Sequence, residues 1–350
     1  MNAVVAADYS TPDSGEVVQI TPGLLWLRMP LPFELDHINL YLIEDVDGWV
    51  IVDCGLFSSA TTEVWDAVIE KHLGDKPVKQ VVVTHAHVDH IGAAGWLCDR
   101  FDVPLYMTGR EYDLVQEFLA ELATPNGDSQ VTRVEFFHRL GMNPKQTTSL
   151  MAIYGGFADL FSVLPTEINR LEDGDYLTIG SNRWQVIVSE GHSIAHASLY
   201  SRSLGILISG DQVLPRISSN VSVGPHDPDG NPLRSWLCSL NHLKTLPADT
   251  LVLPAHNFPF IGIRKRLDEL IEGHQQDLKK IEQICTEPMH IMQQVEQLYD
   301  RKLSLFDLLL ASGECLAHVH YLMQKGRISR SLDGEGRYCY QTISADQERR

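Results

Sequence analysis

The chain has 350 residues, 44% of them hydrophobic and 21% charged, so it can bury one large core and a smaller second one. Its formal net charge of −18 gives no summed positive field to attract phosphate backbones or anionic lipids, so neither nucleic acid nor a membrane is an expected partner. Residues 1–20 carry no lysine, no arginine and no long apolar run, which excludes a readable signal peptide and favours a cytoplasmic protein.

The first part of the chain has the pattern of short strands that lead into alternating helices and strands. β-Branched and aromatic runs predict the strands, and an apolar period near 3.6 predicts the helices. Strands are expected over residues 24–29, 39–43, 48–52, 80–84 and 103–107, and helices over residues 61–73 and 91–101. The three consecutive valines in Gln80–Thr84 are typical of a buried strand.

Between residues 109 and 165 the composition changes to amphipathic helical stretches separated by turn signals such as Gly141–Pro144. The expected helices cover residues 111–122, 131–140 and 150–164. We interpret this segment as a helical insertion that could cover an active site.

Strand signals resume in the second half of the chain, and a helical region follows them. The expected strands cover residues 176–179, 184–189, 197–201, 205–209 and 250–253, and helical sequence runs from about residue 263 to residue 294. A last helix is expected over residues 314–324, before a hairpin over residues 327–341 with its tip at Asp333–Gly336. A helix followed by a hairpin indicates a winged-helix-like end.

The segment Thr84–His90 contains a dense group of possible metal ligands. His85, His87, Asp89 and His90 place three imidazoles and one carboxylate within six residues, directly after the predicted strand. These donors suit zinc, iron or manganese. On a loop, the first two histidines can face one metal while the other two residues face a second.

Two metals need more donors than one loop supplies, and further candidates occur where other predicted strands end. His192, Asp211 and His256 each follow an apolar strand and a small or turn residue. His196 lies on the same stretch as His192, and we interpret it as a supporting residue rather than a ligand.

These residues together resemble the metallo-β-lactamase superfamily, whose His-x-His-x-Asp-His motif is matched by residues 85–90. The resemblance implies that one metal is held by His85, His87 and His192, that a second is held by Asp89, His90 and His256, and that Asp211 bridges them. It also implies that Asp53, in the turn Val52–Gly55, accepts a hydrogen bond from a ligand imidazole and fixes its tautomer.

The resemblance further implies the fold. We expect an α/β architecture in which two mixed β-sheets pack face to face with helices outside, an αββα sandwich. The catalytic domain is predicted over residues 17–264, including the helical insertion over about 109–165. Residues 265–350 are predicted to form a small C-terminal domain that is helical and winged-helix-like.

A hydrolase with two divalent metal ions is the activity that this resemblance implies. Zinc is the expected metal, with iron or manganese as alternatives. Two such ions lower the pKa of a shared water, and the resulting bridging hydroxide is the expected nucleophile. Asp89 is the expected catalytic residue, because it would orient that hydroxide while binding the second metal.

The bond that is cleaved is less constrained, because fold and metal do not decide the substrate. A bridging Asp211 argues against the β-lactam hydrolases of the superfamily, which lack it, and Leu214 stands where the lactonase pattern has a tyrosine. A thioester or related acyl substrate is therefore our leading hypothesis. An endoribonuclease or phosphodiesterase, a lactonase and a di-iron oxidoreductase stay open as alternatives.

Candidate substrate contacts follow the metal-ligand candidates along the chain. Arg216 and Asn220 come after Asp211, and Arg264 comes after His256, so we expect these three side chains to offer polar or cationic contacts to a small-molecule substrate. The apolar stripe within residues 314–324 is typical of a core or of a homodimer interface rather than of a nucleic-acid reader.

Overall fold

The computed structural model describes residues 3–124 and 127–343, and its contacts divide the chain into two compact units. Unit 1 comprises Met1–Phe118, Phe157–Ser219 and Leu243–Leu267, and unit 2 comprises Leu119–Gly156, Asn220–His242 and Asp268–Arg350. The helical insertion predicted over residues 109–165 is therefore divided, and only its middle part belongs to unit 2.

The first sheet of unit 1 has seven strands in the order β2-β3-β4-β5-β6-β7-β8. The strands from β2 to β5 pair antiparallel, and those from β5 to β8 pair parallel. Their bounds are β2 (Val17–Thr21), β3 (Leu24–Pro30), β4 (His37–Glu44), β5 (Trp49–Val52), β6 (Val78–Val82), β7 (Leu105–Thr108) and β8 (Asn169–Leu171).

The second sheet of unit 1 also has seven strands, in the order β1-β14-β13-β12-β11-β10-β9. Only β12 and β13 pair parallel, so their carboxyl ends point the same way. The bounds are β1 (Val5–Ala6), β9 (Tyr176–Ile179), β10 (Asn182–Ser189), β11 (His196–Ser201), β12 (Ile206–Gly210), β13 (Leu251–Pro254) and β14 (Phe260–Ile261). The two-residue strands β1 and β14 pair with each other and were not predicted.

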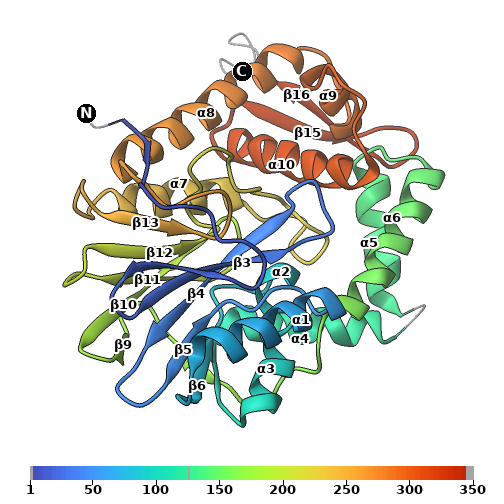
Figure 1. Ribbon diagram of the computed structural model, residues 1–350. Helices are drawn as coiled ribbons and strands as arrows, with labels where there is room; N and C mark the ends of the chain where they lie inside the picture. The colour runs from blue at the N-terminus through green and yellow to red at the C-terminus, as the bar shows by residue number, and fades with distance from the viewer. Residues whose placement is uncertain (1–2, 125–126, 344–350) are drawn as a thin grey trace. The chain divides into compact units, whose positions relative to one another are not determined.

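The two sheets face each other (Figure 1), and a hydrophobic core of buried residues from both lies between them. Trp26 and Tyr41 from the first sheet and Trp184 and Leu199 from the second are buried in it. Successive side chains of a strand point to opposite faces of the sheet, so every second residue of these strands faces the other sheet. Helices α1 (Ser59–Val68) and α3 (Ala94–Phe101) contact the first sheet. The predicted fold class, two mixed β-sheets with helices, is confirmed.

Unit 2 consists of helices and one hairpin. Its elements are α5 (Asp128–Arg139), α6 (Pro144–Gly156), α7 (Pro232–Leu243), most of α8 (Ile263–Ile284), α9 (Ile291–Leu298), α10 (Leu305–Gln324), β15 (Ile328–Leu332) and β16 (Tyr338–Thr342). The chain thus ends its described part with a helix and a hairpin, in the predicted order, although α10 begins nine residues before the predicted helix and α7 was not predicted. The division between the units runs through α4 (Gly109–Leu122).

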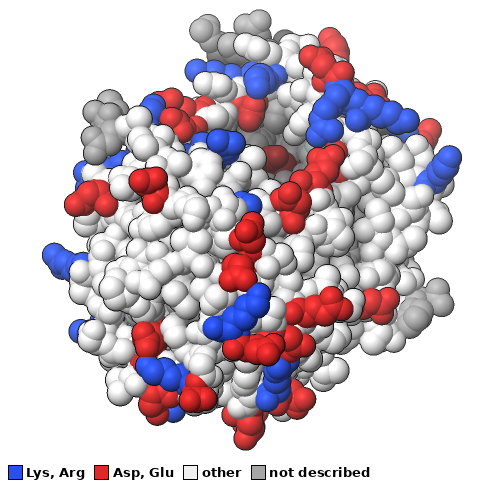
Figure 2. All heavy atoms as spheres, viewed as in Figure 1, with Lys and Arg blue, Asp and Glu red and all other residues white. Residues whose placement is uncertain are grey.

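On the face drawn in Figure 2, Lys and Arg side chains lie among Asp and Glu side chains. Among the residues that the structure describes, no helix is long and apolar enough to cross a membrane.

Candidate metal centre

Seven His and Asp side chains of unit 1 meet where four strands end. His85 and His87 lie between β6 and the short helix α2 (Val88–Ile91), which itself carries Asp89 and His90. The other three follow the ends of β10, β12 and β13, and are His192, Asp211 and His256. Strand ends of the two packed sheets therefore bring together residues that are up to 171 positions apart.

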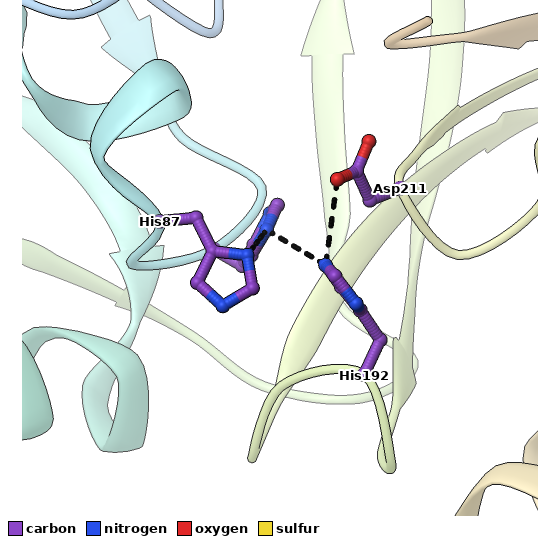
Figure 3. A group of neighbouring side chains, drawn as sticks. His87, His192 and Asp211 are labelled. Atoms are coloured by element: carbon purple, nitrogen blue, oxygen red, sulfur yellow. Dashed lines mark hydrogen bonds and ion pairs between the residues drawn. The ribbon is translucent and has the colours of Figure 1, made fainter. Parts of the chain in front are cut away.

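Four of these side chains form what we call the first donor group: His85, His87, His192 and Asp211. One donor atom from each lies within 4.8 Å of the others. Nε2 of His85 lies 2.9 Å from Nδ1 of His87 and 3.2 Å from Nε2 of His192. In Figure 3, the ring of His192 points toward Asp211, whose Oδ2 is 3.4 Å from its Nε2.

Asp89, His90 and His256 form the second donor group, again with donor atoms within 4.8 Å of one another. Oδ2 of Asp89 lies 3.8 Å from Nε2 of His90 and 3.5 Å from Nε2 of His256. Asp211 reaches this group too, since its Oδ2 is 3.6 Å from His90 and its Oδ1 is 3.3 Å from His256. One carboxylate is thus shared by the two groups.

Buried hydrogen bonds on the far side of the rings fix their orientation. Oδ2 of Asp53 lies 2.8 Å from Nδ1 of His90, and both Asp53 oxygens lie about 3 Å from the hydroxyl of Thr84. That hydroxyl is also 3.1 Å from Nδ1 of His85. Because it donates to the carboxylate, it can accept from His85, which leaves the lone pair of His85 on Nε2. The sequence did not indicate this relay through Thr84.

A second relay holds His256, and the sequence did not indicate it either. Nδ1 of His256 donates to the backbone carbonyl of His37 over 2.8 Å, so its Nε2 faces the donor groups with a lone pair. The His37 side chain is fixed in turn, because its Nε2 lies 2.7 Å from Nη2 of Arg28 and 3.0 Å from the backbone N–H of Asn257. Asn257 has a positive φ of 71°, a conformation that asparagine tolerates better than most residues.

His196 binds the backbone of Asp211 and so helps to fix its position. Its ring is buried, and its Nε2 accepts a 3.2 Å hydrogen bond from the backbone N–H of Asp211. Gly210 makes this approach possible, because a Cβ at that position would lie 2.4 Å from Nε2 of His196. The hydroxyl of Ser219 donates to the carbonyl of Asp211, so both backbone groups of the shared aspartate are held.

Between the two donor groups, acceptor atoms face one another with no hydrogen-bond donor among the described residues to satisfy them. His90 donates from Nδ1, so its buried Nε2 carries a lone pair, and within the described part of the chain this atom has no hydrogen-bond partner. It faces the Asp211 carboxylate, which is also an acceptor. Acceptors that face one another out of water are unfavourable unless a cation lies between them. The imidazole and carboxylate set fits zinc, iron or manganese.

The pKa values of the two histidines in the second donor group also show that this site favours positive charge. Burial opposes protonation of His90, yet the carboxylates of Asp53 and Asp89 raise its pKa well above the ordinary value. Burial also opposes protonation of His256, and Asp211 nevertheless raises its pKa to about 10. A divalent cation supplies this charge in place of protons, so the residues fit a metal ion.

The three predicted substrate contacts lie in different surroundings. Arg216 is exposed, and its guanidinium carbon is 4.9 Å from the centre of the Phe258 ring. Arg264 donates from Nε and Nη2 to the carbonyl of Leu246 at 3.2 and 3.0 Å, which gives it a structural contact within unit 1. Asn220 belongs to unit 2, so the structure does not place it against the donor groups. Substrate contact by these residues stays a prediction.

Comparison with known proteins identifies the family. The sequence profile of the metallo-beta-lactamase superfamily matches residues 34–256, which include both donor groups. The chain belongs to this superfamily. A second profile, for the metallo-beta-lactamase-like C-terminal domain, matches residues 278–343.

Individual members of the superfamily resemble the chain over most of its length. A beta-lactamase domain protein from Burkholderia ambifaria superposes with a TM-score of 0.89 and 39% identity, over 96% of this chain and 97% of that one. The probable metallo-hydrolase YqjP from Bacillus subtilis is 23% identical over 91% of this chain and 98% of its own length. A hydroxyacylglutathione hydrolase from Idiomarina loihiensis is 28% identical over 65% of this chain and 63% of its own. The protein is a metal-dependent hydrolase of this superfamily.

Proposed function

We propose that this metallo-hydrolase cleaves a thioester or related acyl substrate with two divalent metal ions, zinc being the expected metal. The observation that carries the two-metal proposal is the position of Asp211. Its two carboxylate oxygens lie within 3.6 Å of His90, His192 and His256, so one side chain reaches both donor groups. A carboxylate in this position is suited to bridge two cations.

The choice of substrate is supported by relatives. Hydroxyacylglutathione hydrolases of Idiomarina loihiensis and Cereibacter sphaeroides match this chain in sequence, and a thioester is the bond that an acylglutathione contains. Both matches cover less than two thirds of the relative's own length, so the acyl class rather than one named substrate is proposed. A small-molecule substrate also agrees with the net charge of −18, which disfavours RNA.

The metal ions, when bound, would lower the pKa of a water and polarise the substrate carbonyl. The chain's own residues would then position the reactants. Asp89 is partly exposed and faces His90 and His256, which offset the cost of burial and bring its pKa down to about 2. It is therefore a carboxylate at neutral pH and can accept a hydrogen bond from the attacking water, which orients the water toward the carbonyl carbon.

The experiment that tests this proposal combines metal analysis with a substrate panel. Metal content is measured on purified protein, and hydrolysis is followed for acylglutathione and acyl-CoA thioesters, homoserine lactones, a phosphodiester, a β-lactam and a short RNA. About two metals per chain and preferential thioester turnover are expected. Preferential cleavage of the phosphodiester or RNA would assign the chain to a nuclease function instead. One iron per chain without hydrolysis would overturn the proposal.

A further inference from the structure

A fully buried glutamate lies behind the first donor group and contributes no ligand to it. Glu111 stands in the first turn of α4, with an exposed fraction of 0%. Its Oε2 accepts a 2.9 Å hydrogen bond from the backbone N–H of Ala86, and its Oε1 accepts one of 2.6 Å from the backbone N–H of Ala195. Both oxygens are therefore engaged by the backbone.

The two amides belong to the two loops that carry the histidines of the first donor group. Ala86 stands between His85 and His87, and Ala195 follows His192 by three residues. These loops come from different sheets, since one follows β6 and the other follows β10. A single carboxylate thus connects the loops across the gap between the sheets.

A second side chain from the junction of β7 and α4 binds the loop that contains Ala195. The hydroxyl of Thr108, the last residue of β7, donates to the carbonyl of Ala195 over 2.8 Å. Both backbone groups of Ala195 are therefore bound by residues of the β7–α4 junction. This loop leads into β11, whose first residue, His196, binds the backbone of Asp211.

The chemistry of this contact requires a carboxylate. Two N–H donors point at Glu111, and an ionised carboxyl group offers an acceptor oxygen to each. A glutamine could satisfy only one amide, because its NH₂ group would face the N–H of the other. Position in the first turn of α4 favours the negative charge, since the helix N-terminus carries partial positive charge.

We propose that Glu111, assisted by Thr108, is a positioning residue that sets the spacing of the histidines of the first donor group. The inference rests on the proposed binding of metal by that group. The carboxylate fixes the separation of the two loops, and so the 3.2 Å approach of His192 to His85. The backbone hydrogen bond from Ala197 N–H to the carbonyl of Thr84 would still join the two segments over 2.8 Å, but the direct link between Ala86 and Ala195 would be lost. The site would then lose part of the preorganisation on which tight metal binding depends.

The test compares three variants in a competition titration of Zn²⁺ against a chromophoric chelator. Glu111→Gln keeps the size of the side chain but removes one acceptor, and Thr108→Val removes the hydroxyl alone. Asp113→Asn is the matched control, because Asp113 lies on the same helix in an exposed ion pair with Arg170. We expect Glu111→Gln to weaken binding at the tighter site by about 10- to 100-fold, Thr108→Val to weaken it less, and Asp113→Asn to leave it unchanged.

A second readout separates positioning from a merely structural role. The visible absorption spectrum of the Co²⁺-loaded protein reports the geometry around the ion, and it should change in Glu111→Gln even at saturating Co²⁺. Circular dichroism of the metal-free variants checks that they are folded. If Glu111→Gln does not fold, the Zn²⁺ titration of Thr108→Val tests the positioning role instead.

The outcomes distinguish this inference from the proposed function. If the unsubstituted protein binds Zn²⁺ and the folded Glu111→Gln and Thr108→Val variants bind it equally well with the same Co²⁺ spectrum, the positioning role is wrong and the proposed function stands. If the unsubstituted protein binds no metal, both fail. Selective weakening in the two variants, with Asp113→Asn unchanged, supports the inference.

Discussion

Both units of the protein bring histidine and aspartate side chains together. They differ in whether the acceptor atoms of these side chains already receive hydrogen bonds. In unit 2, His290, Asp333 and Cys339 also place donor atoms within 4.8 Å of one another. There, the Asp333 carboxylate already accepts hydrogen bonds from the backbone N–H groups of Glu335 and Arg337 and from Nε of Arg337. A guanidinium beside the carboxylate repels a second cation.

The donor groups of unit 1 show the opposite arrangement. The outer nitrogens of His90, His85 and His256 donate to Asp53, Thr84 and the carbonyl of His37, respectively. Their inner nitrogens are left facing the other members of the donor groups. The comparison shows that proximity of metal-binding residue types is a weak criterion for a metal site. A stronger criterion is whether the lone pairs of those residues already accept hydrogen bonds from nearby N–H or O–H groups.

Removing one aspartate from each cluster should give the largest difference between them. In Asp211→Ala, both donor groups lose their shared carboxylate, so we expect loss of bound metal and a fall in hydrolysis of roughly 10³-fold, corresponding to several kcal/mol. Asp333→Ala should keep the metal content and the rate of the unsubstituted protein. Elemental analysis and initial rates on the two variants measure this, and full metal content in Asp211→Ala would contradict the shared role of that residue.

Acid should destabilise unit 2 through a buried histidine pair that belongs to none of the candidate metal clusters of the described residues. His318 donates from Nδ1 to the carbonyl of Glu314, so its Nε2 accepts from Nδ1 of His274 over 3.1 Å. Burial, then the neighbouring His318, lowers the pKa of His274 from 6.5 to about 4. The folded state therefore keeps this ring neutral, while the unfolded state takes up a proton below pH 6.5. Stability is lost as pH falls from 6.5 toward 4, by about 3 kcal/mol at most.

The measurement for this prediction is hydrogen exchange of the α8 and α10 amides between pH 7 and pH 5, corrected for intrinsic rates and made in excess chelator so that metal release does not contribute. His274→Asn retains a donor for His318 but cannot be protonated, so its exchange should depend less on pH. An equal pH dependence in the variant and the unsubstituted protein would show that His274 is not the source.

Local sequence patterns predicted most of the individual strands and helices, whereas the two-sheet fold was predicted from the family resemblance. Strand periodicity and the rule that sites form at strand ends placed all seven candidate ligands, and the structure brings them together, although metal binding by them stays a prediction. Two missed helix starts had readable signals. Ser304 caps α10 by accepting from the N–H of Asp307, and Asn231 precedes Pro232 at the start of α7.

Asp53 and His196 were named as supporting residues from the sequence, but the other supporting residues could not be, for a physical reason. Glu111 binds the amide of a residue 84 positions away, and the carbonyl of His37 binds a ring 219 positions away. No periodicity or spacing encodes such contacts, because they depend on how two sheets are packed. Thr84 was adjacent to the motif, but the direction of its hydroxyl depends on the left-handed turn at Asp53, which has a φ of 62°.

The smallest effect that we expect comes from this hydroxyl. Thr84→Val preserves the volume of a buried side chain and removes the relay between His85 and Asp53, while the direct contact of Asp53 with His90 remains. We therefore expect Zn²⁺ affinity to fall by about 10-fold, at the lower end of the range for residues that orient metal ligands. Thr250→Val is the matched control, since the hydroxyl of Thr250 is equally buried and has no hydrogen-bond partner among the described residues. If the two variants weaken Zn²⁺ binding equally, the loss reflects packing rather than the relay, and outer hydrogen bonds would no longer distinguish the cluster of unit 1 from that of unit 2.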